Sequence, residues 1–232
     1  MKRNTFAAYD FMRQNKFIVP DKIKMVESIL ESDRVVVNWW CRQSGKTLTN
    51  VKIARDLVVN NPGSSVLVIC PRGSIAKNFV YVTGRSIELN LIDTSSTFFI
   101  KLKNGSIIQA CTYNSDTEFT DKDLVIVDEF DFIEIEKMAE IIIKIKRETE
   151  PTFLQRIVDL LDFQKNRNMK FILSSSKYDR SIFELIKNSL KRYYVTYLNW
   201  EKLSIEKDKI DNLKKMLGDE SFKDEYDSYK PE

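Results

Sequence analysis

A buried-strand pattern that leads directly into a glycine-lysine-threonine loop most limits how this chain can fold. Residues 35–50 read VVVNWWCRQSGKTLTN. A near-continuous apolar run is typical of a strand that is buried on both faces. Residues 47–61, which follow the loop, have helical periodicity and end at the breaker Asn-Asn-Pro-Gly. Strand, loop and helix in this order predict a phosphate-binding loop, because the N–H groups at the start of such a helix point at an anion.

The rest of the chain alternates between strand and helix patterns. Further buried strands are expected at residues 66–70 and 123–130, and two more strands at residues 170–176 and 193–200. Helices are expected at residues 20–31, 131–146, 152–166 and 181–191. Asn104 and Gly105 separate two β-rich runs within residues 98–113, which predicts a hairpin. This alternation favours a mostly parallel central sheet flanked by helices on both faces.

Composition excludes several classes of protein. Of the 232 residues, 43% are apolar and 31% are charged, and no apolar run reaches the roughly 18 residues of a membrane span. Histidine does not occur, which excludes histidine-based acid–base chemistry, serine triads and most zinc enzymes. The scattered cysteines, Cys41, Cys70 and Cys111, indicate neither disulfides nor a zinc site, which suits a reducing cytoplasm. The net charge of +3 is too small to indicate a nucleic-acid partner by itself.

An acidic pair at the end of a strand supplies the second half of a nucleotide site. Residues 123–132 read DLVIVDEFDF, so Asp128 and Glu129 follow an apolar run. In P-loop NTPases the first acid of such a pair assists Mg²⁺, and the second positions or deprotonates the attacking water. Lys46 and Thr47 would reach the phosphates and the Mg²⁺. Loop and acids together predict an ATP or GTP hydrolase with the α/β fold of the P-loop NTPases.

The loop departs from the Walker A template GxxxxGK[ST], because Trp40 stands where the first glycine is usual. The letters R-Q-S-G-K-T resemble the Walker A motif of the large terminase subunit, the motor that packages DNA into tailed-phage and herpesvirus heads. That family commonly reads S-R-Q-x-G-K-[ST], and here Cys41 replaces the small residue that is frequent before the arginine. The segments VLVICPRGSIAKNFVY, NGSIIQA, VIVDEFDFI, ILSSS and LKKMLGDESFKDEYDSY resemble the same family, so the resemblance covers about residues 15–229.

The resemblance implies a role for each matching residue. ATP would be bound by Arg42, Gln43, Ser44, Gly45, Lys46 and Thr47. Mg²⁺ would be held by Thr47 and Asp128. Glu129 would be the catalytic carboxylate, and Arg42 would be an arginine finger that acts on the γ-phosphate. The family's coupling motif, which relays hydrolysis to movement, would consist of Ser174, Ser175 and Ser176.

Two features differ from the family pattern. Many relatives carry a glutamine before the first helix that reads the adenine edge, whereas FIVPDKIKM has a lysine near that place and Gln14 lies too early. The preference for ATP over GTP therefore rests on the resemblance alone. Full-length terminases also continue into an RNase H-like nuclease, for which this chain has no room after its ATPase-like part. We therefore expect an ATPase core at residues 1–190, a small helical subdomain at residues 191–232, and no nuclease activity.

The resemblance also implies partners. These are double-stranded DNA, the portal protein and the small terminase subunit, with a homo-oligomeric ring when assembled, although an isolated domain can be a monomer. Lys191 and Arg192, beside Tyr193 and Tyr194, are candidate DNA contacts, although solvated helix faces also carry such charges. No membrane association is expected. The expected location is the host-cell cytoplasm, or the host nucleus for a herpesvirus-like virus.

Three functions remain open at this point. The first is a viral DNA-packaging ATPase. The second is a helicase-like remodeller of nucleic acids, since V-D-E-F is close to the acidic motif of those enzymes, although 232 residues house only one motor lobe. The third is a nucleotide-dependent assembly switch that hydrolyses nothing. Glu129 argues against the third, because a protein that only binds nucleotide needs no water-activating carboxylate.

Overall fold

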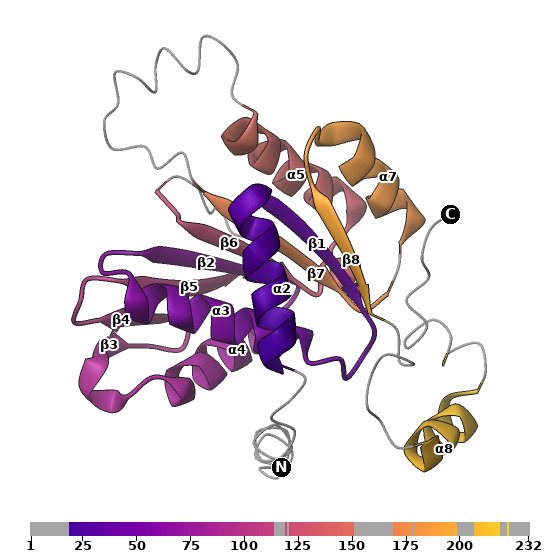
Figure 1. Ribbon diagram of the computed structural model, residues 1–232, viewed down its shortest axis with the longest axis horizontal. Helices are drawn as coiled ribbons and strands as arrows, with labels where there is room; N and C mark the ends of the chain where they lie inside the picture. The colour runs from indigo at the N-terminus through magenta and orange to yellow at the C-terminus, as the bar shows by residue number, and fades with distance from the viewer. Residues whose placement is uncertain are drawn as a thin grey trace.

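A computed structural model describes residues 19–113, 119, 121–150, 169–177, 179–198, 207–218 and 222. Within these residues an eight-stranded sheet forms the centre of the protein (Figure 1). Its strands in chain order are β1 Val35–Trp40, β2 Ser65–Cys70, β3 Ile92–Ser95, β4 Phe99–Leu102, β5 Ile107–Thr112, β6 Leu124–Asp128, β7 Lys170–Ser175 and β8 Tyr194–Leu198.

The strand order across the sheet is β3-β4-β5-β2-β6-β7-β1-β8. From β5 to β8 every neighbouring pair is parallel, whereas β4 runs antiparallel to both β3 and β5. In the parallel part, β1 lies between β7 and β8, and β6 lies between β2 and β7. The carboxyl ends of β1, β6 and β7 therefore meet at one edge of the sheet, where loops of parallel sheets bind ligands.

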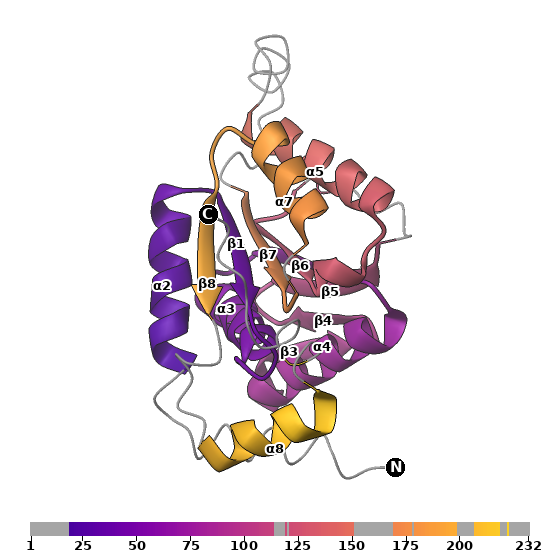
Figure 2. The same ribbon diagram turned by 90° about the vertical axis from the view of Figure 1, so that its right-hand side faces the viewer.

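Helices cover both faces of the sheet (Figures 1 and 2). The helices are α2 Val19–Ser32, α3 Lys46–Asn60, α4 Gly73–Ser86, α5 Ile135–Thr149, α7 Arg180–Ser189 and α8 Lys207–Leu217. Apolar residues of α2, α3 and α4 pack in one core cluster with one face of the sheet. Those of α5 and α7 pack in a second cluster with the other face. The strands β1, β2, β6 and β7 are buried on both faces for this reason.

Trp40 belongs to the sheet rather than to the loop. β1 continues through this residue, whose side chain is fully buried in the core cluster shared with α2. Its indole Nε1 donates a hydrogen bond to Thr196 Oγ1 on β8 at 2.7 Å, and that hydroxyl donates to Asn38 Oδ1 at 2.6 Å. The residue that replaces the usual glycine therefore joins β1 to its edge neighbour, and the loop begins at Cys41.

The structure confirms the expected α/β fold with a mostly parallel sheet, including the hairpin with its turn at Gly105 (φ 87°). The helix α4 and the short edge strand β3 were not predicted. α4 reads GSIAKNFVYVTGRS, and its β-branched residues and glycine weaken the helical signal. The helix expected at residues 152–166 lies outside the described residues.

Among the described residues after residue 190, the chain forms the strand β8 and the helix α8. β8 follows the expected domain boundary at residue 190, yet it pairs with β1, so the sheet itself extends past that boundary. α8 agrees with the helical pattern of the tail. The division into a core and a helical subdomain otherwise stays a prediction. In the described part of the chain, no helix is long and apolar enough to cross a membrane.

Candidate nucleotide-binding and catalytic site

The loop between β1 and α3 is a tight turn that ends in a left-handed glycine. Gly45 has φ 81° and ψ 21°, a conformation that L side chains rarely adopt. Gln43 also has a positive φ of 60°. The Ser44 N–H donates to the Cys41 carbonyl at 3.2 Å, which closes the turn, and the Thr49 N–H donates to the Gly45 carbonyl at 2.9 Å as α3 begins. The first N–H groups of α3 are thus available to an anion.

Strand register brings the acids and the serines to this loop. Asp128, the last residue of β6, pairs with Ser174 of β7, and Ser174 in turn pairs with Asn38 of β1. Because the three strands are parallel neighbours, their next residues leave the sheet at the same edge. Glu129 and Ser176 therefore lie beside the loop that follows β1.

Lys46, Glu129 and Ser176 form a buried polar cluster. The Lys46 ammonium lies 3.1 Å from Glu129 Oε1 and donates to Ser176 Oγ at 2.8 Å. The Ser176 hydroxyl donates to Glu129 Oε2 at 2.9 Å. The relative exposure of the Lys46 and Glu129 side chains is 7% and 20%. A lysine that would bind phosphate is therefore neutralised by the carboxylate that would activate water.

Asp128 and Thr47 form a second polar group at the same edge. Thr47 Oγ1 donates to Asp128 Oδ2 at 3.1 Å, and Asn50 Nδ2 donates to Asp128 Oδ1 at 3.1 Å. Burial of the carboxyl, together with the nearby charge of Glu129, raises the pKa of Asp128 from 3.8 to about 6, despite the opposing effect of Lys46 and the two hydrogen bonds. A cation next to Asp128 would therefore stabilise the charged form of this carboxylate.

The oxygen atoms of Asp128 and Thr47 are suitable ligands for Mg²⁺. The cation prefers oxygen ligands and is usually bound by one or two carboxylates together with substrate phosphates. The Asp128 carboxylate and the Thr47 hydroxyl supply such oxygens within 3.1 Å of each other. The described residues contain no cluster of three or more His, Cys, Asp or Glu side chains that could hold a metal, so a cation here would depend on the phosphates as well.

Asn50 is a site residue that the sequence motifs do not contain. It follows Lys46 by one helical turn on α3 and is 1% exposed. Its amide donates to Asp128 and also to Ser174 Oγ at 3.0 Å. Its spacing from Lys46 was the only available signal, since residues four apart share one face of a helix. Asn50 thereby fixes the acid of β6 relative to the strand end of β7.

The backbone at Glu129 is strained. This residue has φ 56° and ψ 47°, the left-handed conformation that a glutamate rarely adopts. The strained turn directs the Glu129 carboxylate to Lys46 and places Asp131 among buried groups, next to the Ser175 hydroxyl. Burial and then the charge of Glu129 raise the pKa of Asp131. Ser174 thus meets Asn50, Ser175 meets Asp131, and Ser176 meets both Lys46 and Glu129.

A cavity of about 460 Å³ opens beside Thr47 and Glu129. Arg42 lines it from the loop, and Arg72, which precedes α4, lines it as well. Its remaining lining residues are Ser74, Ile75, Asn78 and Phe132. The cavity therefore combines two guanidinium groups with Thr47, an expected Mg²⁺ ligand, and Glu129, the expected catalytic carboxylate. Arg72 was not predicted.

A buried lysine supports the loop. Lys22 of α2 is 8% exposed, and its ammonium donates to the Ser44 carbonyl. The same group lies 5.7 Å from the centroid of the Trp40 ring. Burial lowers the pKa of Lys22 from 10.5 to about 8, against the opposing influence of Cys41. Lys22 is one of the two lysines of the segment FIVPDKIKM, where relatives carry the adenine-reading glutamine, and it contacts the phosphate-binding loop.

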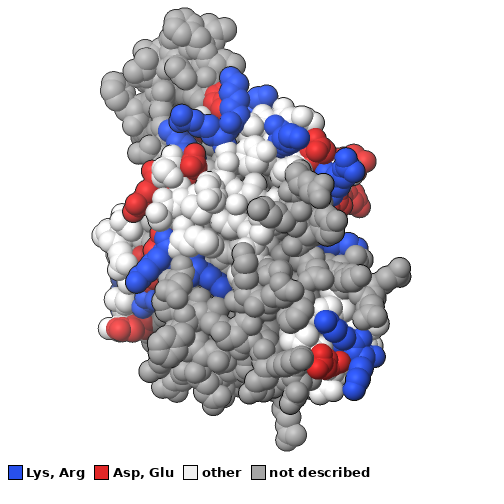
Figure 3. Space-filling view, turned by 45° about the vertical axis from the view of Figure 1, so that its right-hand side comes forward, with Lys and Arg blue, Asp and Glu red and all other residues white. Residues whose placement is uncertain are grey.

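The candidate DNA contacts, Lys191 and Arg192, lie away from the candidate nucleotide site. Lys191 and Arg192 precede β8, whose first residue pairs with Val36 near the start of β1, so they lie at the opposite edge of the sheet. Lys191 contacts Glu150, with its N–H donating to Oε1 at 2.6 Å and its ammonium 4.0 Å from Oε2. Figure 3 shows Lys and Arg side chains gathered at the upper end of one face, with Asp and Glu side chains beside them. A role in DNA binding there stays a prediction.

The parallel sheet, the loop before α3 and the acids at the carboxyl end of β6 define an α/β protein with the P-loop fold. Comparison with known structures shows which solved proteins share this fold. The ATPase domain of the Thermus phage P74-26 large terminase matches with a TM-score of 0.57 at 14% identity, over 84% of this chain and 88% of that chain.

Two further terminases match in the same way. The large terminase of another thermophilic bacteriophage, in complex with ATP-γ-S, matches with a TM-score of 0.55 at 12% identity, over 86% of this chain and 48% of that one. The HK97 bacteriophage large terminase matches with a TM-score of 0.54 at 12% identity, over 85% and 47%. No family model and no curated protein sequence matches the chain. The chain therefore has the fold of the ATPase domains of phage large terminases.

Proposed function

We propose that this chain is a Mg²⁺-dependent ATP hydrolase that drives double-stranded DNA into a viral capsid. One observation supports the proposal: the Lys46 ammonium, the oxygens of Thr47 and Asp128, and the Glu129 carboxylate meet at one edge of the sheet. A protein that only binds nucleotide has no need for a strained Glu129 aimed at this point. The likeness of the fold to terminase ATPase domains supports the same function.

Each residue has a distinct part in the proposed reaction. The N–H groups of Gly45 and Lys46 and the Lys46 ammonium bind the phosphates, and Arg42 faces the γ-phosphate from the cavity. Mg²⁺ at Thr47 and Asp128 would neutralise charge on the phosphate oxygens. Phosphate that binds Lys46 competes with Glu129 for the ammonium, which frees the Glu129 carboxylate to accept a proton from water.

Ser176 connects the change of partner at Lys46 and Glu129 to the position of the end of β7. Its hydroxyl contacts both Lys46 and Glu129, and it directly follows β7. When the lysine and the carboxylate separate, Ser176 cannot keep both contacts. The end of β7 therefore takes one of two arrangements, depending on the nucleotide. Ser174 and Ser175 connect the same strand end to Asn50 and Asp131.

The biological setting belongs to the proposal as well. A packaging motor would act on duplex DNA as a ring at the portal protein, together with a small terminase subunit, in the host cell. Structures of the thermophilic phage terminase described above hold ADP and ATP-γ-S, which supports ATP as the nucleotide of this fold.

Phosphate release from ATP and GTP, with and without duplex DNA and Mg²⁺, tests the proposal. Lys46→Ala and Glu129→Gln are expected to abolish turnover. Arg42→Ala is expected to lower kcat by roughly 10³-fold if it acts on its own γ-phosphate. Lys52→Gln is the matched control, because Lys52 is on the same helix but its side chain is only half-buried and pairs with Asp56. Its turnover should equal that of the wild type.

Nucleotide binding must be measured on the same variants. Glu129→Gln should retain nucleotide affinity, whereas Lys46→Ala should lose it. Binding without turnover in the wild type, even with DNA, would refute the hydrolase and favour an assembly switch. Separation of strands in a duplex by the active protein would instead favour a helicase-like remodeller.

A further inference from the structure

The exposed face of α4 carries basic and uncharged polar side chains but no acid. Between Asp56 and Glu88 the chain contains neither aspartate nor glutamate, while it contains Arg72, Lys77 and Arg85. α4 occupies the middle of this stretch. Charge of one sign over so long a segment is unusual in a chain whose acidic and basic residues nearly balance, at 34 and 37.

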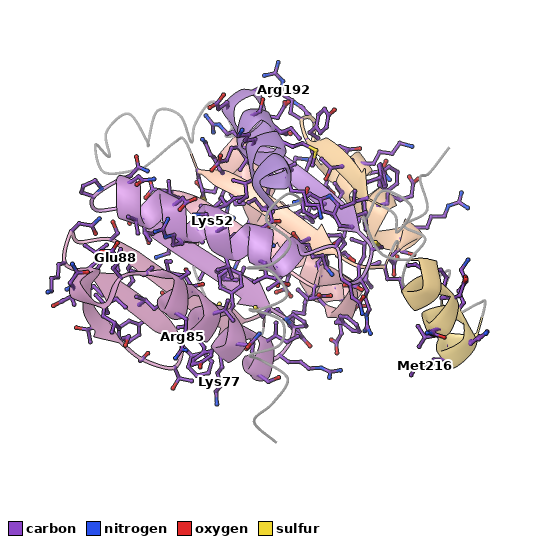
Figure 4. All side chains as sticks on the ribbon, turned by 60° about the horizontal axis from the view of Figure 1, so that its bottom comes forward. Lys52, Lys77, Arg85, Glu88, Arg192 and Met216 are labelled. Atoms are coloured by element: carbon purple, nitrogen blue, oxygen red, sulfur yellow. The ribbon has the colours of Figure 1, made fainter. Side chains whose placement is uncertain are left out.

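Packing fixes which side of α4 faces outward. Ala76, Phe79, Val80 and Thr83 are buried against the sheet. The opposite side presents the exposed residues of the helix, which we name the α4 face: Ser74, Lys77, Asn78, Tyr81 and Arg85. Figure 4 shows the Lys77 and Arg85 side chains leaving α4 on its outer side.

Aromatic rings flank the cations of the α4 face. The Lys77 ammonium lies 5.5 Å from the centroid of the Phe98 ring, and the Arg85 guanidinium carbon lies 5.9 Å from that of Tyr81. Among the described residues no carboxylate pairs with Lys77. The neighbouring Lys101, in contrast, lies 3.8 Å from Asp93. The Phe98 ring leaves the charge of Lys77 available to an external anion, whereas a carboxylate would neutralise it.

These are the residue types that bind the backbone of DNA. Lysine, arginine, serine, asparagine and tyrosine donate to phosphate oxygens without reading the sequence. The 14-residue helix is about 21 Å long, which is the length of roughly six base pairs. Arg85 follows Lys77 by eight positions, so their Cα atoms lie about 12 Å apart along the helix axis. One side of α4 can thus contact more than one phosphate.

We propose that the α4 face binds the phosphate backbone of duplex DNA. This inference rests on the proposed packaging function and names where that function holds its substrate. α4 also begins at the nucleotide cavity, since Arg72, Ser74 and Asn78 line that cavity. DNA on α4 would therefore lie against the element that contacts the nucleotide, which gives hydrolysis a direct path to the DNA.

Salt-dependent binding of a duplex of arbitrary sequence tests this placement. The full chain, Lys77→Gln, Arg85→Gln, the double variant and the control Lys52→Gln are compared by fluorescence anisotropy. Glutamine retains helix propensity, so the exposed substitutions should leave the fold intact. Each lost phosphate contact should reduce the slope of log K against log salt by about 0.9, and the double variant by about 1.8. Lys52→Gln should keep the slope of the wild type.

ATP hydrolysis without DNA, measured on the same preparations, separates this inference from the proposed function. Turnover should be unchanged in Lys77→Gln and Arg85→Gln, whose side chains lie outside the cavity lining. Equal slopes in the wild type and the double variant, or no binding of duplex at low salt, would overturn the placement while leaving the hydrolase untouched. Poly-glutamate and single-stranded RNA serve as competing anions in the same assay. If either binds as tightly as duplex DNA and loses as much affinity in the variants, the assignment to duplex DNA is overturned.

Discussion

Replacing Asp128 by asparagine is expected to stabilise this protein at neutral pH in the absence of Mg²⁺ and nucleotide. The Asp128 side chain is 0% exposed, and its carboxylate must be charged at pH 7 while it is buried beside Glu129. Asparagine has nearly the same shape and no charge. Its oxygen can still accept the hydrogen bond from Asn50.

The magnitude follows from the pKa. Burial and the Glu129 charge raise the pKa of Asp128 from 3.8 to about 6, and each unit corresponds to about 1.4 kcal/mol. The charged form therefore costs roughly 3 kcal/mol relative to the neutral form. Thr47 now donates to the second carboxylate oxygen, and in the variant it must instead accept from the amide nitrogen, which reduces the gain, so we expect about 2–3 kcal/mol. For a chain of this length that raises Tm by roughly 5–10 °C.

The pH dependence has a definite sign. The pKa of Asp128 is higher in the folded state, so the folded state binds more protons than the unfolded state between about pH 4 and pH 6. Wild-type stability therefore falls as pH rises through this window, and the fall should be missing from Asp128→Asn. Urea unfolding in EDTA at about pH 4, 5 and 7 measures it: the two proteins should converge near pH 4 and differ most at pH 7.

Asp93→Asn is the matched control, because this exposed carboxylate makes only a long contact of 3.8 Å with Lys101. Its effect should stay within about 0.5 kcal/mol at every pH. The reasoning is refuted if Asp128→Asn is no more stable than the wild type at pH 7, or if the difference does not change with pH. The variant is also expected to lose Mg²⁺-dependent hydrolysis, so stability and activity should move in opposite directions.

Three further substitutions test other parts of the site. Lys22→Met is expected to raise KM for ATP several-fold with little effect on kcat, because the Ser44 carbonyl loses its donor. Steady-state kinetics measure this, with the exposed Lys24→Met as control, and equal KM values for the two variants would show that the contact is irrelevant. Trp40→Gly, which restores the usual Walker A glycine, should cost about 3–5 kcal/mol in urea unfolding by leaving a cavity, and an unchanged stability would contradict the packing described above. Ser176→Ala should lower kcat while nucleotide affinity, measured by titration, stays that of the wild type; a loss in affinity alone would exclude the coupling role.

The sequence predicted the parts of the fold that repeat a strong local pattern. β1, β2, β6 and β7 are buried on both faces, so their apolar runs are continuous and easily recognised. α4 was missed because its buried side is short and its sequence mixes glycine with β-branched residues. β3 was missed because its four residues are mostly exposed and carry no apolar alternation.

The site was predictable to the extent that its residues sit in contiguous motifs. Gly45, Lys46 and Asp128 belong to such motifs, and parallel strand order alone brings them together. Asn50 and Arg72 were not predictable in this way, because their roles depend on contacts between segments that are distant in sequence. Whether each predicted residue acts as proposed is decided by the kinetic measurements.

The tryptophan in place of the Walker A glycine is compatible with phosphate binding because the loop has another support. A phosphate-binding loop works when its N–H groups face the anion and its carbonyls turn away. Trp40 extends β1 and packs against α2, and the ammonium of Lys22 then holds the carbonyl of Ser44. That bond keeps one loop carbonyl directed at a buried cation. Backbone freedom from a glycine is therefore not needed at position 40, since an element outside the loop determines how the peptide is oriented.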